Sequence, residues 1–203
     1  MFMEYKIMRG IKPVTLAESQ HLVELLDSGL ITNRTMAIDG GAHAGAWTVI
    51  MAEWFNSVHA FEPHPRAFEY LTENCEGLDN VTLHNNALMD RACLVEVYAP
   101  GRTTLTATQV RYASNGGTKA VAIDSFKFQE CGLLKLDIEG AEFMAIQGAV
   151  ETIKRCRPFI LVETNNLGRR FGYENRDTLQ LIRSLGYTQC WAKGVDIGMK
   201  PND

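Results

Sequence analysis

Residues 36–65 constrain the fold of this chain more than any other segment; they read MAIDGGAHAGAWTVIMAEWFNSVHAFEPHP. An apolar run ends in Asp39, a glycine-rich turn follows, and the pattern then predicts a helix. A second apolar run, 58–61, ends in Glu62. This order is typical of a βαβ unit that binds a nucleoside-bearing cofactor. Glycine lets the backbone approach the ligand, and a carboxylate after the second strand accepts hydrogen bonds from ribose hydroxyls.

The spacing of the glycines distinguishes between cofactors. A dinucleotide-binding turn has the form G-x-G-x-x-G, whereas this turn reads Asp39-x-Gly41-x-x-x-Gly45 and has Ala44 before its last glycine. An acid-led turn of this kind suits a ligand with a cationic amino-acid end, and S-adenosylmethionine is such a ligand. The turn therefore favours S-adenosylmethionine over a nicotinamide cofactor.

Length and composition indicate one globular domain that spans residues 1–203. Hydrophobic residues make up 46% of the chain and charged residues 22%, and the net charge of −4 argues against a duplex nucleic-acid partner. The five cysteines include no C-x-x-C pair, which indicates a reducing compartment, and we expect the cytoplasm. Apolar runs stay well below the roughly 18 residues that a membrane span needs, so no membrane partner is expected.

Strand-like and helix-like segments alternate along most of the chain, which predicts an α/β fold with a mostly parallel sheet covered by helices on both faces. An amphipathic helix is expected near 16–26, within an N-terminal helical extension that covers 1–35. Between strands expected at 93–98 and 120–123, the polar and glycine-rich segment 99–117 is expected to form a lid-like loop. The remaining segments predict strands at 36–39, 58–62, 81–83, 133–137, 159–163, 187–192 and 195–199, and helices at 45–55, 66–76, 141–155 and 177–185.

Four acids stand at or beside the ends of predicted strands: Asp39, Glu62, Asp137 and Glu163. Ligands of open parallel sheets bind at the carboxyl ends of the strands, so four acids there indicate a site. The alternative is that each acid caps the helix that follows, since Asp is a good N-cap. His43 lies inside the glycine turn, where we expect it to face the cofactor.

Six segments together resemble the FkbM-type family of class I S-adenosylmethionine-dependent methyltransferases. They are DGGAHAGAWT (39–48), HAFEPHP (59–65), NNALMD (85–90), AIDSF (122–126), LLKLDIEGAE (133–142) and PFILVE (158–163). The resemblance covers roughly residues 36–190. It implies a Rossmann-like sheet of seven strands whose last strand is antiparallel. It also implies transfer of a methyl group, usually to an oxygen of a sugar, natural product or other small metabolite.

The resemblance also implies roles for individual residues. Asp39, Gly41 and Gly45 would hold the methionine end of the cofactor, and Glu62 the ribose hydroxyls. Asn86 and Ala87 would border the adenine, and Asp137 would lie beside the reacting centre. Where the family often has asparagine, this chain has His43, which leaves open how the methionine carboxylate is held.

The chemistry of methyl transfer is an in-line displacement, in which the protein aligns the nucleophile, the methyl group and sulfur. A hydroxyl acceptor also loses its proton, and Asp137 and Glu163 are the candidate bases, unranked by the sequence. Both could equally bind a divalent ion, but two carboxylates fall short of a ligand set and no metal is predicted. The acceptor, expected to be a small molecule or glycan, and the oligomeric state stay open.

Three rival functions remain. A nicotinamide-dependent Rossmann oxidoreductase would share the βαβ unit, although the glycine spacing counts against it. A nucleic-acid methyltransferase would carry an N-P-P-Y-like motif or a Pro-Cys pair, and the sequence contains neither Pro-Pro nor Pro-Cys. The third rival is a protein that binds the cofactor without turnover, which the sequence leaves open because the base is unassigned.

Overall fold

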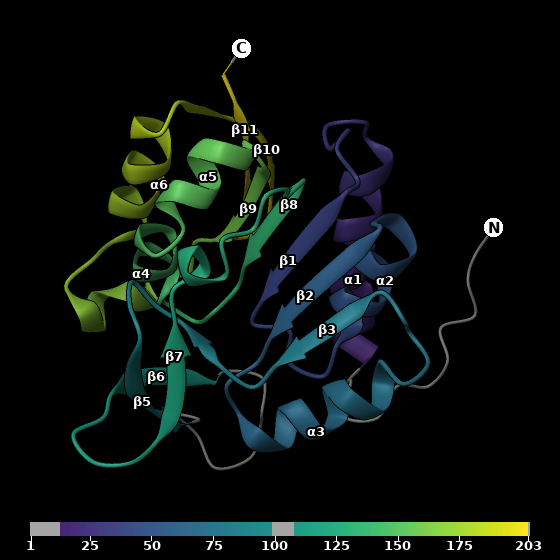
Figure 1. Ribbon diagram of the computed structural model, residues 1–203. Helices are drawn as coiled ribbons and strands as arrows, with labels where there is room; N and C mark the ends of the chain where they lie inside the picture. Colours follow the sequence, from purple (N-terminus) through teal and green to yellow (C-terminus); the bar gives the residue numbers. More distant parts are fainter. Residues whose placement is uncertain (1–12, 99–107, 203) are drawn as a thin grey trace.

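A seven-stranded sheet forms the centre of the structure, a computed structural model that describes residues 13–98 and 108–202 (Figure 1). β1 pairs in parallel with β2 and β8, whereas β11 runs antiparallel to both β9 and β10. The prediction of a mostly parallel sheet with an antiparallel last strand is therefore confirmed. In spatial order the strands are β10 (Tyr187–Lys193), β11 (Asp196–Pro201), β9 (Phe159–Glu163), β8 (Leu133–Leu136), β1 (Met36–Gly40), β2 (Ser57–Phe61) and β3 (Val81–His84).

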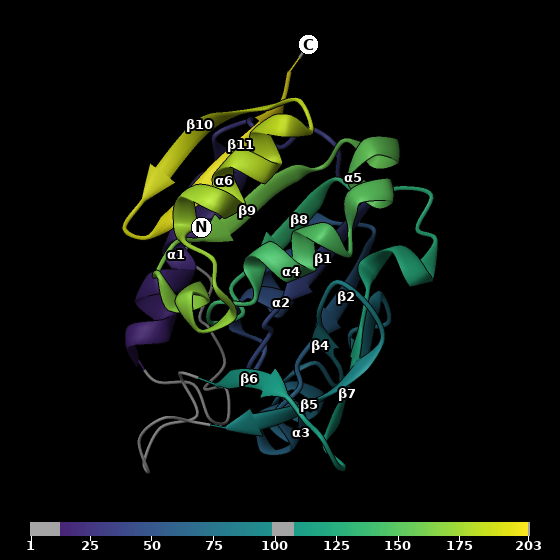
Figure 2. The same ribbon diagram turned by 90° about the vertical axis from the view of Figure 1, so that its left-hand side faces the viewer.

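Helices cover both faces of this sheet, as the alternation of segments predicts (Figures 1 and 2). Because successive side chains of a strand point to opposite faces, each strand contributes to two cores. Ile38 of β1 packs in the core beneath α4, α5 and α6, and its neighbour Ala37 packs in the core beneath α1 and α2. The helices are α1 (Pro13–Asp27), α2 (Ala46–Trp54), α3 (Pro65–Asn74), α4 (Glu142–Gln147), α5 (Val150–Cys156) and α6 (Asn175–Ser184), with the 3₁₀ helices η2 (Ile123–Phe126) and η3 (Leu167–Phe171).

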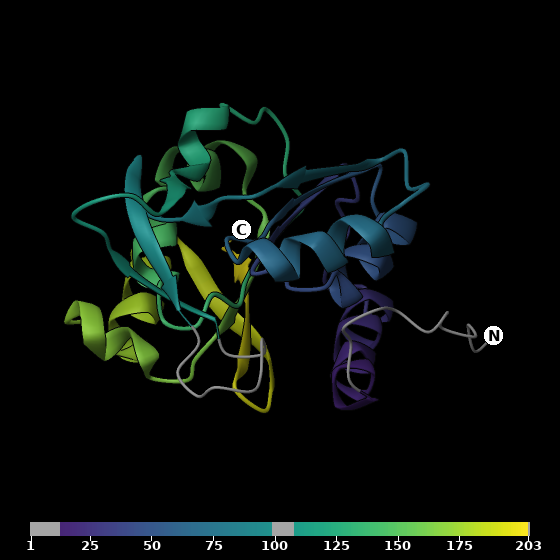
Figure 3. The same cartoon turned by 90° about the horizontal axis from the view of Figure 1, so that it is seen from below.

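A second, smaller sheet was not predicted from the sequence. It has the order β4-β7-β5-β6 and lies on the opposite side of the molecule from α1 (Figure 3). The prediction of a loop over 99–117 is wrong for 109–112, because β6 pairs antiparallel with β5 there; the rest of that loop as far as 107 lies outside the described residues. The four strands are β4 (Ala87–Leu88), β5 (Cys93–Tyr98), β6 (Gln109–Tyr112) and β7 (Thr118–Val121).

The single helix predicted over 141–155 is also wrong, because the chain forms α4 and α5 with a break at Gly148. A Cβ atom at Gly148 would lie 2.2 Å from the carbonyl oxygen of Met89, so the break lets the chain pack closely against the residue that follows β4. The carbonyl of Gly148 also accepts a hydrogen bond from the Asp124 amide at 2.8 Å. A tertiary contact that no periodicity encodes therefore ends α4.

The five cysteines are free thiols, all within the described residues. No helix in the described part of the chain has both the length and the apolar character needed to cross a membrane.

Asp124 supplies a side-chain cap to α5, which generates a test of the fold. Its carboxylate accepts hydrogen bonds from the amides of Glu151 at 3.0 Å and Thr152 at 2.8 Å, and from the Thr152 hydroxyl at 2.7 Å. We expect Asp124→Ala to lower the free energy of unfolding by about 1–2 kcal/mol, since these donors lose their acceptor. Urea denaturation would measure this, with exposed Asp79→Ala as the control; equal losses in the two variants would contradict the capping role.

Candidate functional site

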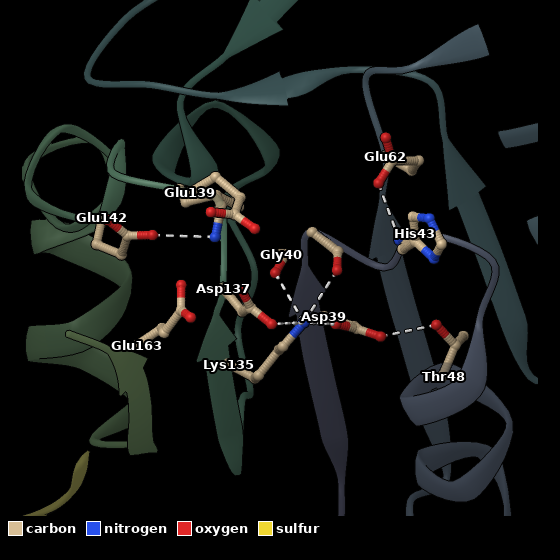
Figure 4. A network of polar contacts seen from close by, with 12 residues as sticks. Asp39, Gly40, His43, Thr48, Glu62, Lys135, Asp137, Glu139, Glu142 and Glu163 are labelled. Atoms are coloured by element: carbon tan, nitrogen blue, oxygen red, sulfur yellow. Dashed lines mark hydrogen bonds and ion pairs between the residues drawn. The ribbon is translucent and has the colours of Figure 1, made fainter. Parts of the chain in front are cut away.

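A buried ion pair joins the first strand to the fourth parallel strand of the sheet (Figure 4). The register places Asp39 of β1 directly beside Lys135 of β8, and the Lys135 Nζ atom lies 2.9 Å from Asp39 Oδ1. The other carboxylate oxygen of Asp39 accepts a hydrogen bond from the Thr48 hydroxyl of α2 at 2.7 Å. Asp39 is 0% exposed and Lys135 4% exposed. Both oxygens of Asp39 are therefore engaged inside the protein.

Lys135 also fixes the turn that follows β1. Its ammonium group donates to the carbonyl oxygens of Gly40 at 3.1 Å and Gly41 at 3.0 Å, so its three donors have three protein acceptors. Gly41 has a φ of +78°, and a Cβ atom there would lie 1.8 Å from the carbonyl oxygen of Asp137. Only glycine fits where the turn after β1 touches the end of β8.

The carboxylate of Glu62, directly after β2, organises the other side of this turn. It accepts hydrogen bonds from the backbone amides of His43 and His64, each at 2.8 Å, and is 3% exposed. Burial raises the pKa of Glu62 to about 7, against the opposing effect of these two amides. A carboxylate has about four acceptor positions, so two remain for hydroxyl donors from the cavity that Glu62 lines.

Two cavities open at the carboxyl ends of the parallel strands and share Gly41, His43 and Asp137 in their linings. The first, the Glu62 cavity, spans about 600 Å³, including space that is open to solvent. The second, the Glu163 cavity, spans about 840 Å³ on the same measure. Apart from the shared residues, the first is lined by Phe61, Glu62, Pro63, Asn86, Ala87, Leu88, Thr108, Val110, Ile138, Glu139 and Ala141. The second adds His21, Ala42, Ala46, Trp47, Lys135, Glu163, Lys193, Gly194, Val195 and Asp196.

Carboxyl groups gather where the two cavities meet (Figure 4). Asp137 has a side chain that is 44% exposed and lies 4.0 Å from the Lys135 ammonium group. The amide of Asn165 donates to Glu163 at 2.5 Å and to Glu139 at 3.3 Å. Burial, together with the charges of Asp137 and Glu139, raises the pKa of Glu163 to about 10. Burial and the nearby Asp137 charge raise the pKa of Glu139 to about 7.

Glu142 differs from these groups because its carboxylate already accepts hydrogen bonds from the backbone. Its Oε1 atom accepts hydrogen bonds from the amides of Ile138 and Gly140, each at 3.0 Å, and the residue is 5% exposed. It therefore holds the turn between β8 and α4. No group of three or more His, Cys, Asp or Glu side chains is arranged to bind a metal within residues 13–98 and 108–202.

Most residues predicted for the site line the two cavities. Gly45 and Asp39 line neither of them. Gly45 has a φ of +91°, and a Cβ atom there would lie 2.8 Å from the Leu71 side chain, so the left-handed backbone and the contact with α3 both favour glycine. The predicted residues that do line a cavity are Gly41, His43, Glu62, Asn86, Ala87, Asp137 and Glu163.

Lys135 is the main residue of the site that sequence reasoning missed. It stands inside the apolar run LLKL, and a lysine is almost never fully buried unless it is paired. That pattern alone would have indicated a buried acid as its partner, and Asp39 was the acid available on a neighbouring parallel strand.

Comparison with known proteins gives one family match. The model of the Methyltransferase FkbM domain matches residues 39–188. No curated protein sequence matches the chain.

Solved structures share the fold at low sequence identity. Methyltransferase FkbM from Methylobacillus flagellatus KT has a TM-score of 0.52 and 17% identity, with 82% of this chain and 43% of that chain covered. The chain thus spans less than half the length of that relative. SMU.1697c from Streptococcus mutans, solved in complex with SAH, gives a TM-score of 0.54 and 14% identity, with 87% and 94% covered. N-methyltransferase NodS from Bradyrhizobium japonicum WM9, also with S-adenosyl-L-homocysteine, gives 0.50 and 11%, with 93% and 86% covered.

The raised pKa of Glu163 predicts how stability depends on pH. Below about pH 4.5 the group is protonated in both the folded and unfolded chain, whereas between 4.5 and about 10 it is ionised only when unfolded. Its contribution to stability is therefore present at low pH and lost as pH rises through this interval. We expect Glu163→Gln, a neutral isostere, to raise the melting temperature at pH 8 and leave it unchanged near pH 4.

The matched control is exposed Glu76→Gln, which should leave the melting temperature unchanged at both pH values. Calorimetric melting of the wild type and both variants would measure the effect. A lower melting temperature of Glu163→Gln at pH 8 would show that the folded protein needs this carboxylate ionised.

Proposed function

The chain belongs to the FkbM methyltransferase family, and from this membership we propose that it transfers a methyl group from S-adenosylmethionine to a hydroxyl oxygen of a small molecule or glycan. The observation that carries the proposal is the pair of cavities that meet at Asp137, one lined by Glu62 and the other by Glu163. An elongated cofactor with a nucleoside at one end and an amino acid at the other would extend from one cavity to the other. Its methyl group would lie near the residues that both cavities share.

The residues of the Glu62 cavity suit a nucleoside. Glu62 keeps two acceptor positions for ribose hydroxyls, while Asn86 and Ala87 supply a polar and an apolar wall for the adenine. The complexes of SMU.1697c and NodS with S-adenosylhomocysteine support the same choice of cofactor. When bound, S-adenosylmethionine supplies an electrophilic methyl group on a cationic sulfur.

We assign Gly41 and His43 to the binding of the amino-acid end of the cofactor. Asp39 and Gly45 support the turn that carries them. Asp39 acts through Lys135, whose ammonium group holds the carbonyls of the turn. Gly45 begins α2 at a left-handed backbone position and sets the direction of the helix. These two residues thus shape the turn without lining a cavity.

We assign the acceptor to the part of the Glu163 cavity that lies beyond the amino-acid end of the cofactor. Trp47 offers an apolar ring surface there, and Asp137 and Glu163 offer hydrogen-bonding groups for a hydroxyl. A carboxylate within hydrogen-bond distance of the hydroxyl would align it and take its proton as the oxygen attacks. The half-exposed side chain of Asp137 then has water available to remove that proton.

A reducing compartment, the cytoplasm, suits the five free thiols.

Binding of the cofactor can be tested without knowledge of the acceptor. We expect S-adenosylhomocysteine to bind in calorimetry and NAD to give no heat. Glu62→Ala should weaken S-adenosylhomocysteine binding by about 1–3 kcal/mol, because charge-assisted hydrogen bonds to the ribose are lost. Exposed Glu76→Ala is the matched control and should bind as the wild type does.

Binding of NAD in place of S-adenosylhomocysteine would overturn the cofactor assignment. If the cofactor binds, incubation of a metabolite extract with S-adenosylmethionine labelled on the methyl group should transfer label to a hydroxyl-bearing compound. Binding without any labelled product would favour a cofactor-binding protein that lacks turnover.

A further inference from the structure

The two carboxyl groups of the acceptor side have different surroundings. The Asp137 carboxylate lies 4.0 Å from the Lys135 ammonium group. Glu163 has a neutral neighbour instead, the Asn165 amide, which donates to it at 2.5 Å. A fixed cation favours the ionised form of the nearest carboxyl more strongly than a neutral amide donor does. Two carboxyls in hydrogen-bond contact cannot both be ionised without a large repulsion.

The carboxyl groups of Asp137 and Glu163 also lie within reach of each other, and a hydrogen bond between two carboxyls requires a proton on one of them. Other charged groups around the pair and Lys135 come from several elements. They are Asp39 on β1, Glu139 in the turn before α4, Glu142 at the start of α4, Arg170 in η3 and Asp196 on β11. His21 and Lys193 border the same cavity. Glu139 and Glu142 add negative charge beside Glu163, so a proton on the pair limits the repulsion.

We infer that Lys135 is a positioning residue that keeps Asp137 ionised and leaves the shared proton on Glu163. This inference rests on the proposed function for its catalytic meaning, since it makes Asp137 the base and Glu163 a neutral hydrogen-bond donor. The hydroxyl proton of the acceptor passes to the Asp137 carboxylate while the oxygen forms its bond to the methyl carbon and the bond from that carbon to sulfur breaks. Glu163 keeps its own proton throughout and donates it in a hydrogen bond to Asp137.

Three hydrogen bonds hold the Lys135 ammonium group in place and so keep its charge close to Asp137. All three donors are held by Asp39, Gly40 and Gly41, and the side chain is 5% exposed, so the cation cannot swing away or exchange partners with solvent. Burial also raises the pKa of Glu163, so the geometry and the electrostatics of this carboxyl agree. Asp39 thereby influences Asp137 through Lys135, although Asp39 itself lines neither cavity.

Carbon-13 NMR of the side-chain carboxyls in the ligand-free protein tests this division of roles. The Glu163 signal is assigned from its disappearance in Glu163→Gln, and the Asp137 signal from Asp137→Asn. At pH 7 we expect Glu163 at the protonated frequency and Asp137 at the ionised one. In Asp137→Asn the Glu163 signal should titrate at lower pH, because a neighbouring negative charge is gone.

Removal of Lys135 is tested as the double variant Lys135→Met with Asp39→Asn, because the single change leaves a buried unpaired acid that endangers folding. At pH 7 its Glu163 signal should move toward the ionised frequency as the proton becomes shared with Asp137. The matched control removes an exposed ion pair, Lys154→Met with Glu151→Gln, and should leave both signals unchanged.

A wild-type Glu163 signal that is ionised at pH 7 would overturn the inference, as would unchanged signals in a folded Lys135→Met, Asp39→Asn protein. Calorimetry with S-adenosylhomocysteine on the wild type keeps this outcome separate from failure of the proposed function. Glu163→Gln should keep its S-adenosylhomocysteine affinity within about twofold, because a neutral side chain replaces a neutral one. A large loss there would also count against a protonated Glu163.

Discussion

The buried pair of Lys135 and Asp39 is the interaction on which the site depends. Removing both charges from water costs several kcal/mol, and only close geometry with further hydrogen bonds offsets that cost. The structure meets this condition, since Thr48 satisfies the second oxygen of Asp39 and two glycine carbonyls satisfy the remaining donors of Lys135. Such a pair adds little net stability over apolar packing, so its presence is better explained by the geometry that it fixes.

What it fixes is the relation between two segments almost one hundred residues apart. The turn after β1 carries Gly41 and His43, and the end of β8 carries Asp137. The ion pair, the Gly41–Asp137 contact and the hydrogen bond from the Asp137 amide to Gly40 all join these segments. Preorganised groups need no rearrangement when charge develops during a reaction, which is how fixed polar sites lower a barrier.

The sequence predicts those parts of the fold that depend on local pattern. Strand–helix alternation predicts the central sheet, and its acids at strand ends point to the edge where both cavities open. The sequence does not predict the break at Gly148, which depends on contact with Met89, or β6, whose pairing partner is set by tertiary structure. Within the site, the roles of Asp39 and Gly45 depend on contacts with residues that are distant in sequence. Asp39 pairs with Lys135 through the strand register, and Gly45 packs against Leu71. Neither contact can be read from the local sequence.

The two sheets differ in how far apart their strands lie in sequence, and this has a consequence for how the chain folds. The small sheet joins strands that all lie within 87–121, whereas the central sheet pairs Asp39 with Lys135 across the entire small-sheet segment. Closing a longer loop costs more chain entropy before any contact compensates for it, so local pairings form faster. We therefore expect the ladder between β1 and β8, and with it the ion pair, to form late in folding. Interactions that are absent from a transition state act mainly on the unfolding rate, so we expect loss of the ion pair to speed unfolding more than it slows folding.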